Sequence, residues 1–136
     1  MYRWLIILIF MLAAPTLSYG QTERDCQKVI HEQIGGVMEY RLDDGTRVDL
    51  LLPNRAIEID WATKWGEGVG QSLYYSIKTS RPPVVLLLAK DAKWMKYAKR
   101  VETCGIECWV WNVRTEKFIY GRKKLPKNNP FSLDKQ

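Results

Sequence analysis

The sequence predicts a single α/β domain, in which one mixed β-sheet is flanked by helices. Three observations predict this fold class. Short apolar stretches with the alternation of strands are concentrated over residues 37–61. The continuous apolar run 84–88 is typical of a strand buried on both faces. An antiparallel hairpin that leads into a helix and then into such a strand gives a mixed sheet with helices on its faces.

The predicted elements follow one another without an internal repeat or a second domain. Thr22 is expected to cap a first helix that runs to about Ile34 and ends at the two glycines that follow it. The later predicted elements are strands over 37–42, 46–52 and 56–61, a helix over 66–79, a strand over 84–88, a helix from Asp91 to about Thr103, a strand over 107–113 and a short edge strand over 118–120. The core order is therefore helix, three strands, helix, strand.

Residues 1–20 resemble a signal peptide rather than part of the domain. Arg3 precedes the apolar run 4–14, and the small residues near Gly20 suit a signal peptidase. The run is short for a bilayer span, so we expect cleavage near Gly20 and no membrane span in the mature chain. An uncleaved N-terminal membrane anchor is the alternative. Either way the sequence predicts an exported protein, periplasmic or secreted.

The excess positive charge of the chain lies at its C-terminal end. Acidic and basic residues are equal in number over 21–113, and the last 23 residues supply most of the formal net charge of +6. We assign 21–120 to the domain and 121–136 to a basic, disordered tail. A basic tail suits a polyanion such as nucleic acid or an anionic membrane surface. A solvated terminal extension is the alternative.

Three cysteines in an exported chain indicate one disulfide and one free thiol. Cys104 and Cys108 flank Gly105 at an expected turn, so their pairing is favoured. A bond from Cys26 to either of them is the alternative. A zinc site is disfavoured because three cysteines and the distant His31 lack the usual paired spacing.

Acidic residues interrupt the apolar strands in a way that predicts a site. Asp49 lies in an otherwise apolar run, and Glu58 and Asp60 alternate with apolar neighbours, so these two share one side of their strand. The predicted hairpin places Glu39 opposite Asp49. Buried carboxylates need a partner, and a hard divalent cation prefers such oxygen ligands. An edge strand whose acids face water is the alternative.

Polar side chains on the following helices could complete this site. Gln71 and Tyr75 are four residues apart and share a helix face, which extends back to Lys64. A basic stripe lies on the next helix, with Lys93, Lys96 and Arg100 among its members.

For Trp109 and Trp111 we expect core packing rather than base stacking, because large aromatic residues dominate protein cores.

The order of elements and the placed acids resemble the PD-(D/E)xK nuclease superfamily, which has a restriction-endonuclease-like fold. Its second-strand acid matches Asp49, and its third-strand motif aligns with Glu58-Ile59-Asp60. The branch with a Gln-x-x-x-Tyr motif matches Gln71 and Tyr75. The resemblance covers about 21–113 through short, degenerate motifs, so element order and spacing contribute most of its weight.

The resemblance implies a metal-dependent nuclease in which Mg²⁺ or Mn²⁺ activates water for attack on phosphate. It implies that Asp49 and Glu58 bind the metal, with Glu39 and Asp60 as further ligands, and that Gln71 takes part in catalysis. Nucleic acid is the implied partner, DNA in preference to RNA. Tyr75 and the basic stripe, Lys93, Lys96 and Arg100, would bind it.

One departure from the family pattern concerns the lysine that orients or activates the attacking water. Asp60 occupies that position, and Lys64 could substitute for the lysine from the start of the helix. Asp60 could instead be a metal ligand, or the site could be inactive. A catalytically inactive nuclease-fold module that binds nucleic acid or another partner is therefore the alternative function. A small secreted interaction protein is a third possibility.

Overall fold

The computed structural model describes residues 20–122, in which a mixed sheet of six strands is flanked by three α-helices. This confirms the predicted α/β class. The signal peptide and nearly all of the basic tail predicted above lie outside the described residues. Within the described range, no helix combines the length and the apolar character needed to cross a bilayer. The elements in chain order are α1 (Glu23–Ile34), β1 (Val37–Arg41), β2 (Arg47–Leu52), β3 (Arg55–Trp61), the 3₁₀ turn η1 (Ala62–Lys64), α2 (Trp65–Thr79), β4 (Pro83–Ala89), α3 (Trp94–Thr103), β5 (Glu107–Asn112) and β6 (Lys117–Tyr120).

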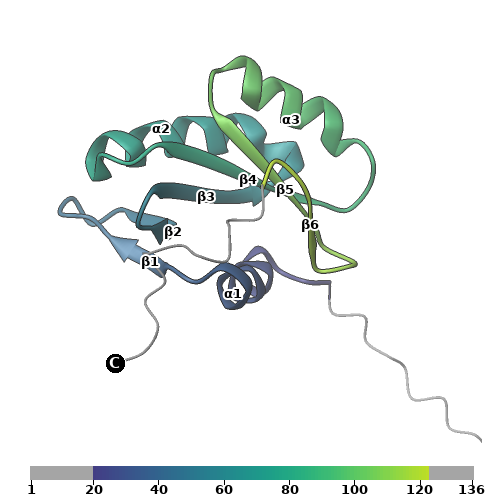
Figure 1. Ribbon diagram of the computed structural model, residues 1–136, viewed down its shortest axis with the longest axis horizontal. Helices are drawn as coiled ribbons and strands as arrows, with labels where there is room; N and C mark the ends of the chain where they lie inside the picture. The colour runs from purple at the N-terminus through teal and green to yellow at the C-terminus, as the bar shows by residue number, and fades with distance from the viewer. Residues whose placement is uncertain (1–19, 123–136) are drawn as a thin grey trace, which may run out of the picture.

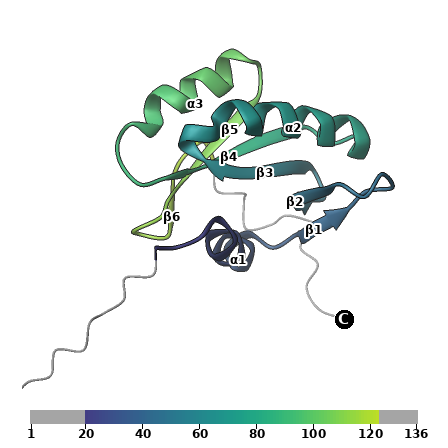
Figure 2. The same ribbon diagram turned by 180° about the vertical axis from the view of Figure 1, so that it is seen from behind.

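The strands lie side by side in chain order from β1 to β6. The first two pairings are antiparallel, β3 with β4 and β4 with β5 are parallel, and β6 returns antiparallel to β5. Helices α2 and α3 cover one face of the sheet and α1 covers the other (Figures 1 and 2). The result is three layers, and the carboxyl ends of the parallel strands β3 and β4 lie at the same end of the sheet.

Strand β4 explains why the sequence shows an unbroken apolar run. Val84, Leu86 and Leu88 pack into the core beneath α1, whereas Val85 and Leu87 pack into the core beneath α2 and α3. Strand β5 divides in the same way, with Trp109 and Trp111 on the α1 side and Cys108 and Val110 on the other side. Both tryptophans are buried, which confirms that they serve the core.

Helix boundaries agree with the sequence at α1 and differ at α3. Thr22 caps α1 as expected: its hydroxyl accepts a hydrogen bond from the Asp25 amide, and the Asp25 carboxylate accepts one from the Thr22 amide. Asp91 does not cap α3. Its carboxylate instead accepts the Lys93 amide in a turn, and the helix begins at Trp94.

The predicted disulfide is not present in this structure. All three cysteines are free thiols: Cys26 and Cys108 are buried and Cys104 is exposed. Cys26 lies in the core beneath α1, and Cys108 lies in the core on the opposite face of the sheet, so the sheet separates them. Cys104 sits at the end of α3 with its side chain exposed, while the Cys108 side chain packs inward.

The turn between α1 and β1 depends on Gly36, and we expect Gly36→Ala to destabilise the fold by about 2–3 kcal/mol. Gly36 has φ +93°, and an added Cβ would lie 2.7 Å from Leu52 Cδ2 and 2.8 Å from the Leu51 carbonyl oxygen. Gly70→Ala is the matched control, because it lies in α2 with no atom within 4 Å of the added Cβ. That control should gain about 0.5–1 kcal/mol from helix propensity. Urea unfolding measures both, and equal stabilities would contradict the expectation.

Candidate functional site

A cavity of about 450 Å³ lies where α1, α2 and strands β1 to β3 meet. We call it the acidic pocket, because six carboxyl groups and two basic side chains line it. Seven residues singled out in the sequence come together here: Glu39, Asp49, Glu58, Asp60, Lys64, Gln71 and Tyr75. Its remaining lining residues are Glu23, Gly45, Thr46, Arg47 and Glu67.

The pocket forms where β2 and β3 stop pairing. Their antiparallel register ends at Leu50 opposite Ile57, so Asp49 and Glu58 are the next positions along the two strands. In place of a further ladder bond, the Asp49 carboxylate accepts the Ile59 amide at 2.8 Å. The two acids therefore lie at the opening between the strands, while β2 stays paired with β1 on its other side.

Glu58 is the most perturbed acid of the pocket. Its side chain is 6% exposed, and its Oε2 atom is buried without a hydrogen-bond partner among the described residues. Burial raises its pKa to about 10, with repulsion from Asp49, Asp60 and Glu23 adding to the effect. Burial likewise raises the pKa of Asp49 to about 7, although the Ile59 amide opposes this. At neutral pH the metal-free pocket therefore keeps a proton on Glu58.

Asp60 shares the pocket with Glu58, as the strand alternation predicted. Burial and the charge of Glu23 raise its pKa to about 6, while the nearby Lys64 ammonium lowers it. Helix α2 can approach this acid because it has a glycine there: a Cβ on Gly68 would lie 3.7 Å from the Asp60 carboxylate and 3.2 Å from Val85. The structure thus places Lys64 beside Asp60 in the same cavity.

Glu39 lies opposite Asp49, because Met38 pairs with Leu50 and Tyr40 with Val48. Its carboxylate is already engaged. It accepts a hydrogen bond from the Gln27 amide at 3.0 Å and lies 3.5 Å from Arg47 Nε and 3.9 Å from Arg24 Nη1. Glu39 is therefore balanced by basic side chains, in contrast to Glu58.

Helix α2 and the turn η1 before it line another side of the pocket. Gln71 and Tyr75 of α2 line it together, which confirms that they share a helix face, and Lys64 joins them from the end of η1. Tyr75 is 8% exposed, and burial together with the charges of Glu58 and Asp49 raises its pKa to about 12. Its hydroxyl therefore stays protonated and can donate a hydrogen bond at any working pH.

Sequence reasoning missed three contributors to the pocket: Glu23, Gln27 and Glu67. Glu23 lies in the first turn of α1, where acids are common for helix-dipole reasons, so its type gave no signal. Gln27 is buried and donates both to Glu39 and to the Asp49 carbonyl, at 2.8 Å for the latter. These contacts join α1 to β1 over 12 residues and to β2 over 22 residues, separations over which local patterns carry no information.

The basic stripe lies outside the acidic pocket. Lys93, Lys96 and Arg100 are exposed on α3 and the turn before it. Lys93 lines a second cavity, Lys96 lies over the Tyr97 ring and Arg100 lies over the rings of Trp65 and Tyr97. The predicted substrate-binding residues of this stripe are thus placed beside the site rather than in it.

The donor set of the acidic pocket fits a hard divalent cation. Its free ligand atoms are carboxylate oxygens, and the buried Glu58 Oε2 lacks a partner in the part of the chain that the structure describes. Over residues 20–122, no three His, Cys, Asp or Glu side chains are grouped closely enough to form a complete protein metal site. Mg²⁺ does not require one, because it commonly binds through one or two carboxylates and keeps several waters. The pair Asp49 and Glu58 meets that smaller requirement.

Comparison with protein-family models, with curated proteins and with solved structures gives no match to this chain.

Proposed function

We propose that this chain is an exported, metal-dependent nuclease that hydrolyses phosphodiester bonds at the acidic pocket. The main support is the meeting in one cavity of Asp49, Glu58, Asp60, Lys64, Gln71 and Tyr75, which come from two strands and the following helix. The export part of the proposal depends only on the pattern of residues 1–20.

The order of elements supports membership of the PD-(D/E)xK superfamily. Helix α1, strands β1 to β3, helix α2 and strand β4 follow one another in the order that the resemblance implies. The acids also occupy the implied strands, since Asp49 is in β2 and Glu58 is in β3, with Gln71 and Tyr75 on the next helix. A restriction-endonuclease-like core is therefore part of the proposal.

Asp49 and Glu58 would hold Mg²⁺ or Mn²⁺, with Asp60 beside them and Glu39 held back by its contacts to arginine. A bound ion would lower the pKa of an attacking water and stabilise negative charge on the phosphate. To bind the ion, Glu58 must release the proton that burial and Asp49 keep on it. Ion binding should therefore become tighter as pH rises.

The other side chains have roles that follow from their charge and position. Lys64 is exposed at the start of α2 and lines the pocket, so its ammonium can contact the phosphate or the attacking water. The protonated Tyr75 hydroxyl can donate a hydrogen bond inside the pocket, and the exposed Gln71 amide can donate or accept at its mouth. The basic residues of α3 would attract the polyanion from the neighbouring surface.

Asp60 favours a second candidate function, a nuclease-fold module that binds nucleic acid without cleaving it. The third-strand position that holds lysine in the family carries an acid here, and this acid lines the same pocket as Asp49 and Glu58. If Lys64 does not replace the missing lysine, metal binding could persist without hydrolysis. The two candidates therefore differ in cleavage and agree in metal binding.

Thermal melts and cleavage assays test the proposal together. We expect Mg²⁺ or Mn²⁺ to raise the melting temperature of the purified protein relative to EDTA, because the ion binds only the folded pocket. The same ions should support cleavage of single-stranded DNA, double-stranded DNA or RNA. Asp49→Asn and Glu58→Gln should abolish both effects, since each keeps the side-chain size and removes a ligand charge.

Glu32→Gln is the matched control, because Glu32 is exposed on α1 and does not line the pocket. This variant should keep the metal shift and the cleavage. A metal shift without cleavage of any of the three substrates would favour the binding module. If neither a shift nor cleavage is seen, the nuclease proposal is wrong.

A further inference from the structure

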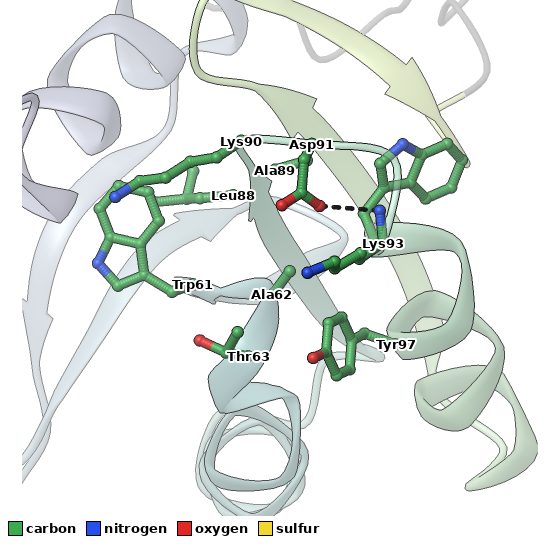
Figure 3. Close-up of a pocket in the computed structure, with 10 residues that line it drawn as sticks. Trp61, Ala62, Thr63, Leu88, Ala89, Lys90, Asp91, Lys93 and Tyr97 are labelled. Atoms are coloured by element: carbon green, nitrogen blue, oxygen red, sulfur yellow. Dashed lines mark hydrogen bonds between the residues drawn. The ribbon is translucent and has the colours of Figure 1, made fainter.

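A second cavity of about 450 Å³ opens at the carboxyl ends of β3 and β4, next to the start of α3. We call it the aromatic pocket. Three aromatic side chains line it, Trp61, Trp94 and Tyr97, together with Lys90 and Lys93. Figure 3 shows Trp61 and Lys90 on one side of the opening and Lys93 and Tyr97 on the other. Among its lining residues, only Lys93 was assigned a role from the sequence, as a ligand of nucleic acid.

The aromatic walls are held in place by their neighbours. The Lys90 ammonium lies 4.1 Å from the centre of the Trp61 ring. Trp94 packs against Tyr120 with ring centres 5.5 Å apart, and the Tyr120 hydroxyl donates to the Glu102 carboxylate at 2.7 Å. Trp94 is thus supported by β6 and by the far end of its own helix. A ring held in this way offers a flat surface whose ordering costs little on binding.

The surroundings of the pocket are basic. Lys93, Lys96, Lys99 and Arg100 are exposed on α3 and the turn before it. Asp91 is the one acid among the described residues that line the pocket, and its carboxylate accepts the Lys93 amide at 2.8 Å. Aromatic rings interleaved with cations suit a ligand that has a flat ring and a negative charge. A neutral apolar ligand would gain nothing from the positive charges of the lysines.

The aromatic pocket adjoins the acidic pocket along the chain. Asp60 and Lys64 line the acidic pocket, whereas Trp61, Ala62 and Thr63 between them line the aromatic pocket. Consecutive residues at the end of β3 and in the turn η1 therefore line one cavity or the other. A polymer with a phosphate at Lys64 would have its neighbouring unit within reach of Trp61.

We propose that the aromatic pocket binds the base of an unpaired nucleotide, with Lys90 and Lys93 on its phosphate, and that the substrate is single-stranded nucleic acid. This inference rests on the proposed function, since the adjoining acidic pocket supplies the reason for a nucleic-acid ligand. A base inside a duplex is paired and stacked on both faces, so it cannot reach the pocket unless it is flipped out. Stacking on tryptophan tolerates any base, because every base has a π-face.

Fluorescence anisotropy in EDTA tests the proposal without cleavage. The probes are a fluorescein-labelled single-stranded DNA of mixed sequence, the same DNA as a duplex, and the matching RNA strand. Trp94→Ala should weaken single-strand binding about tenfold, the usual scale for loss of one stacked base, and leave duplex binding unchanged. Trp94→Phe should restore much of the affinity. Met95→Ala is the control, because Met95 is exposed beside Trp94 and does not line the pocket.

A second variant removes the risk that Trp94→Ala fails to fold. Lys90 and Lys93 are exposed, so replacing both with alanine should leave the fold intact and remove only the Lys90 contact with the Trp61 ring. This double variant should weaken single-strand binding and lower its salt dependence, by about 0.7 in logarithmic slope for each phosphate that the protein no longer neutralises. An unchanged affinity in both the Trp94 and the lysine variants would overturn the proposal.

The outcomes separate this proposal from the proposed function. Suppose that the wild type cleaves duplex DNA but binds the single strand no better than Trp94→Ala does. That result would overturn the proposed base pocket and leave the nuclease proposal standing. Protein that cleaves nothing but loses single-strand binding in Trp94→Ala would reject hydrolysis and keep the base pocket. Protein that neither cleaves nor binds any probe would overturn both.

Discussion

Metal-free Glu58→Gln protein should be about 3–5 kcal/mol more stable than wild type at pH 8 and within about 1 kcal/mol of wild type at pH 5. The reason is that Glu58 is buried among other acids, one of its oxygen atoms has no partner within residues 20–122, and the fold keeps it protonated. Glutamine has nearly the same shape and is neutral at every pH. It is therefore a substitute for the protonated acid that does not have to take up a proton when the chain folds, so the substitution Glu58→Gln removes this dependence on pH.

The direction of this pH effect follows from the two pKa values of Glu58. In the unfolded chain the acid has its ordinary pKa of 4.5, and in the folded protein burial raises that pKa to about 10. Between these values the folded state holds a proton that the unfolded state has released, so the free energy of unfolding falls as pH rises. The stabilisation is complete below pH 4.5 and is lost progressively towards pH 10. Asp49, with its pKa raised to about 7, adds to the loss below neutral pH.

Urea unfolding in EDTA at several pH values measures this effect. The wild-type free energy of unfolding should decrease from pH 5 to pH 8, and the decrease should be much smaller in Glu58→Gln. Glu32→Gln, which changes an exposed acid outside the pocket, should follow the wild-type curve. A wild-type stability that is flat or rises over this range would show that Glu58 does not hold a proton in the folded protein.

The fold class and much of the pocket were predictable because their signals are local. The alternation of Glu58 and Asp60 with apolar residues places both on one face of β3, and the turn before Thr46 sets the register that brings Glu39 opposite Asp49. The unbroken run 84–88 indicated a strand buried on both faces, as β4 is. Periods of two and of 3.6 residues survive in the sequence because packing requires them.

The parts that sequence reasoning missed depend on contacts between distant segments. Glu23 and Gln27 reach the pocket only because α1 packs beneath the sheet, and the type of these residues gave no indication of it. Trp61 and Trp94 looked like ordinary apolar residues, yet the crossovers after β3 and β4 bring them to one cavity. The Cys104–Cys108 bond predicted from the sequence does not appear in this structure for the same reason. Closeness along the chain favoured Cys104 with Cys108, whereas the tertiary fold exposes the first and buries the second.

Lys64→Ala should slow cleavage about 10²- to 10³-fold and leave the metal-induced rise in melting temperature intact. Lys64 lines the acidic pocket without contributing an oxygen ligand, so its loss should remove a contact to water or phosphate rather than the ion. Burial raises the pKa values of Glu23 and Asp60, and the Lys64 ammonium opposes this rise. Its removal should therefore raise the pKa of Asp60 and shift any acid limb of the pH–rate profile to higher pH.

The comparison uses single-turnover cleavage with Mg²⁺ and thermal melts on the same preparations. Lys28→Ala is the matched control, because Lys28 is exposed on α1 and lies outside both cavities, and it should cleave at the wild-type rate. Lys64→Ala that cleaves as fast as wild type would show that Lys64 has no part in catalysis. If Lys64→Ala loses both the metal-induced rise in melting temperature and cleavage, Lys64 is needed to keep the pocket in its metal-binding form. Only slow cleavage with the shift retained identifies Lys64 as the catalytic lysine of the proposed nuclease.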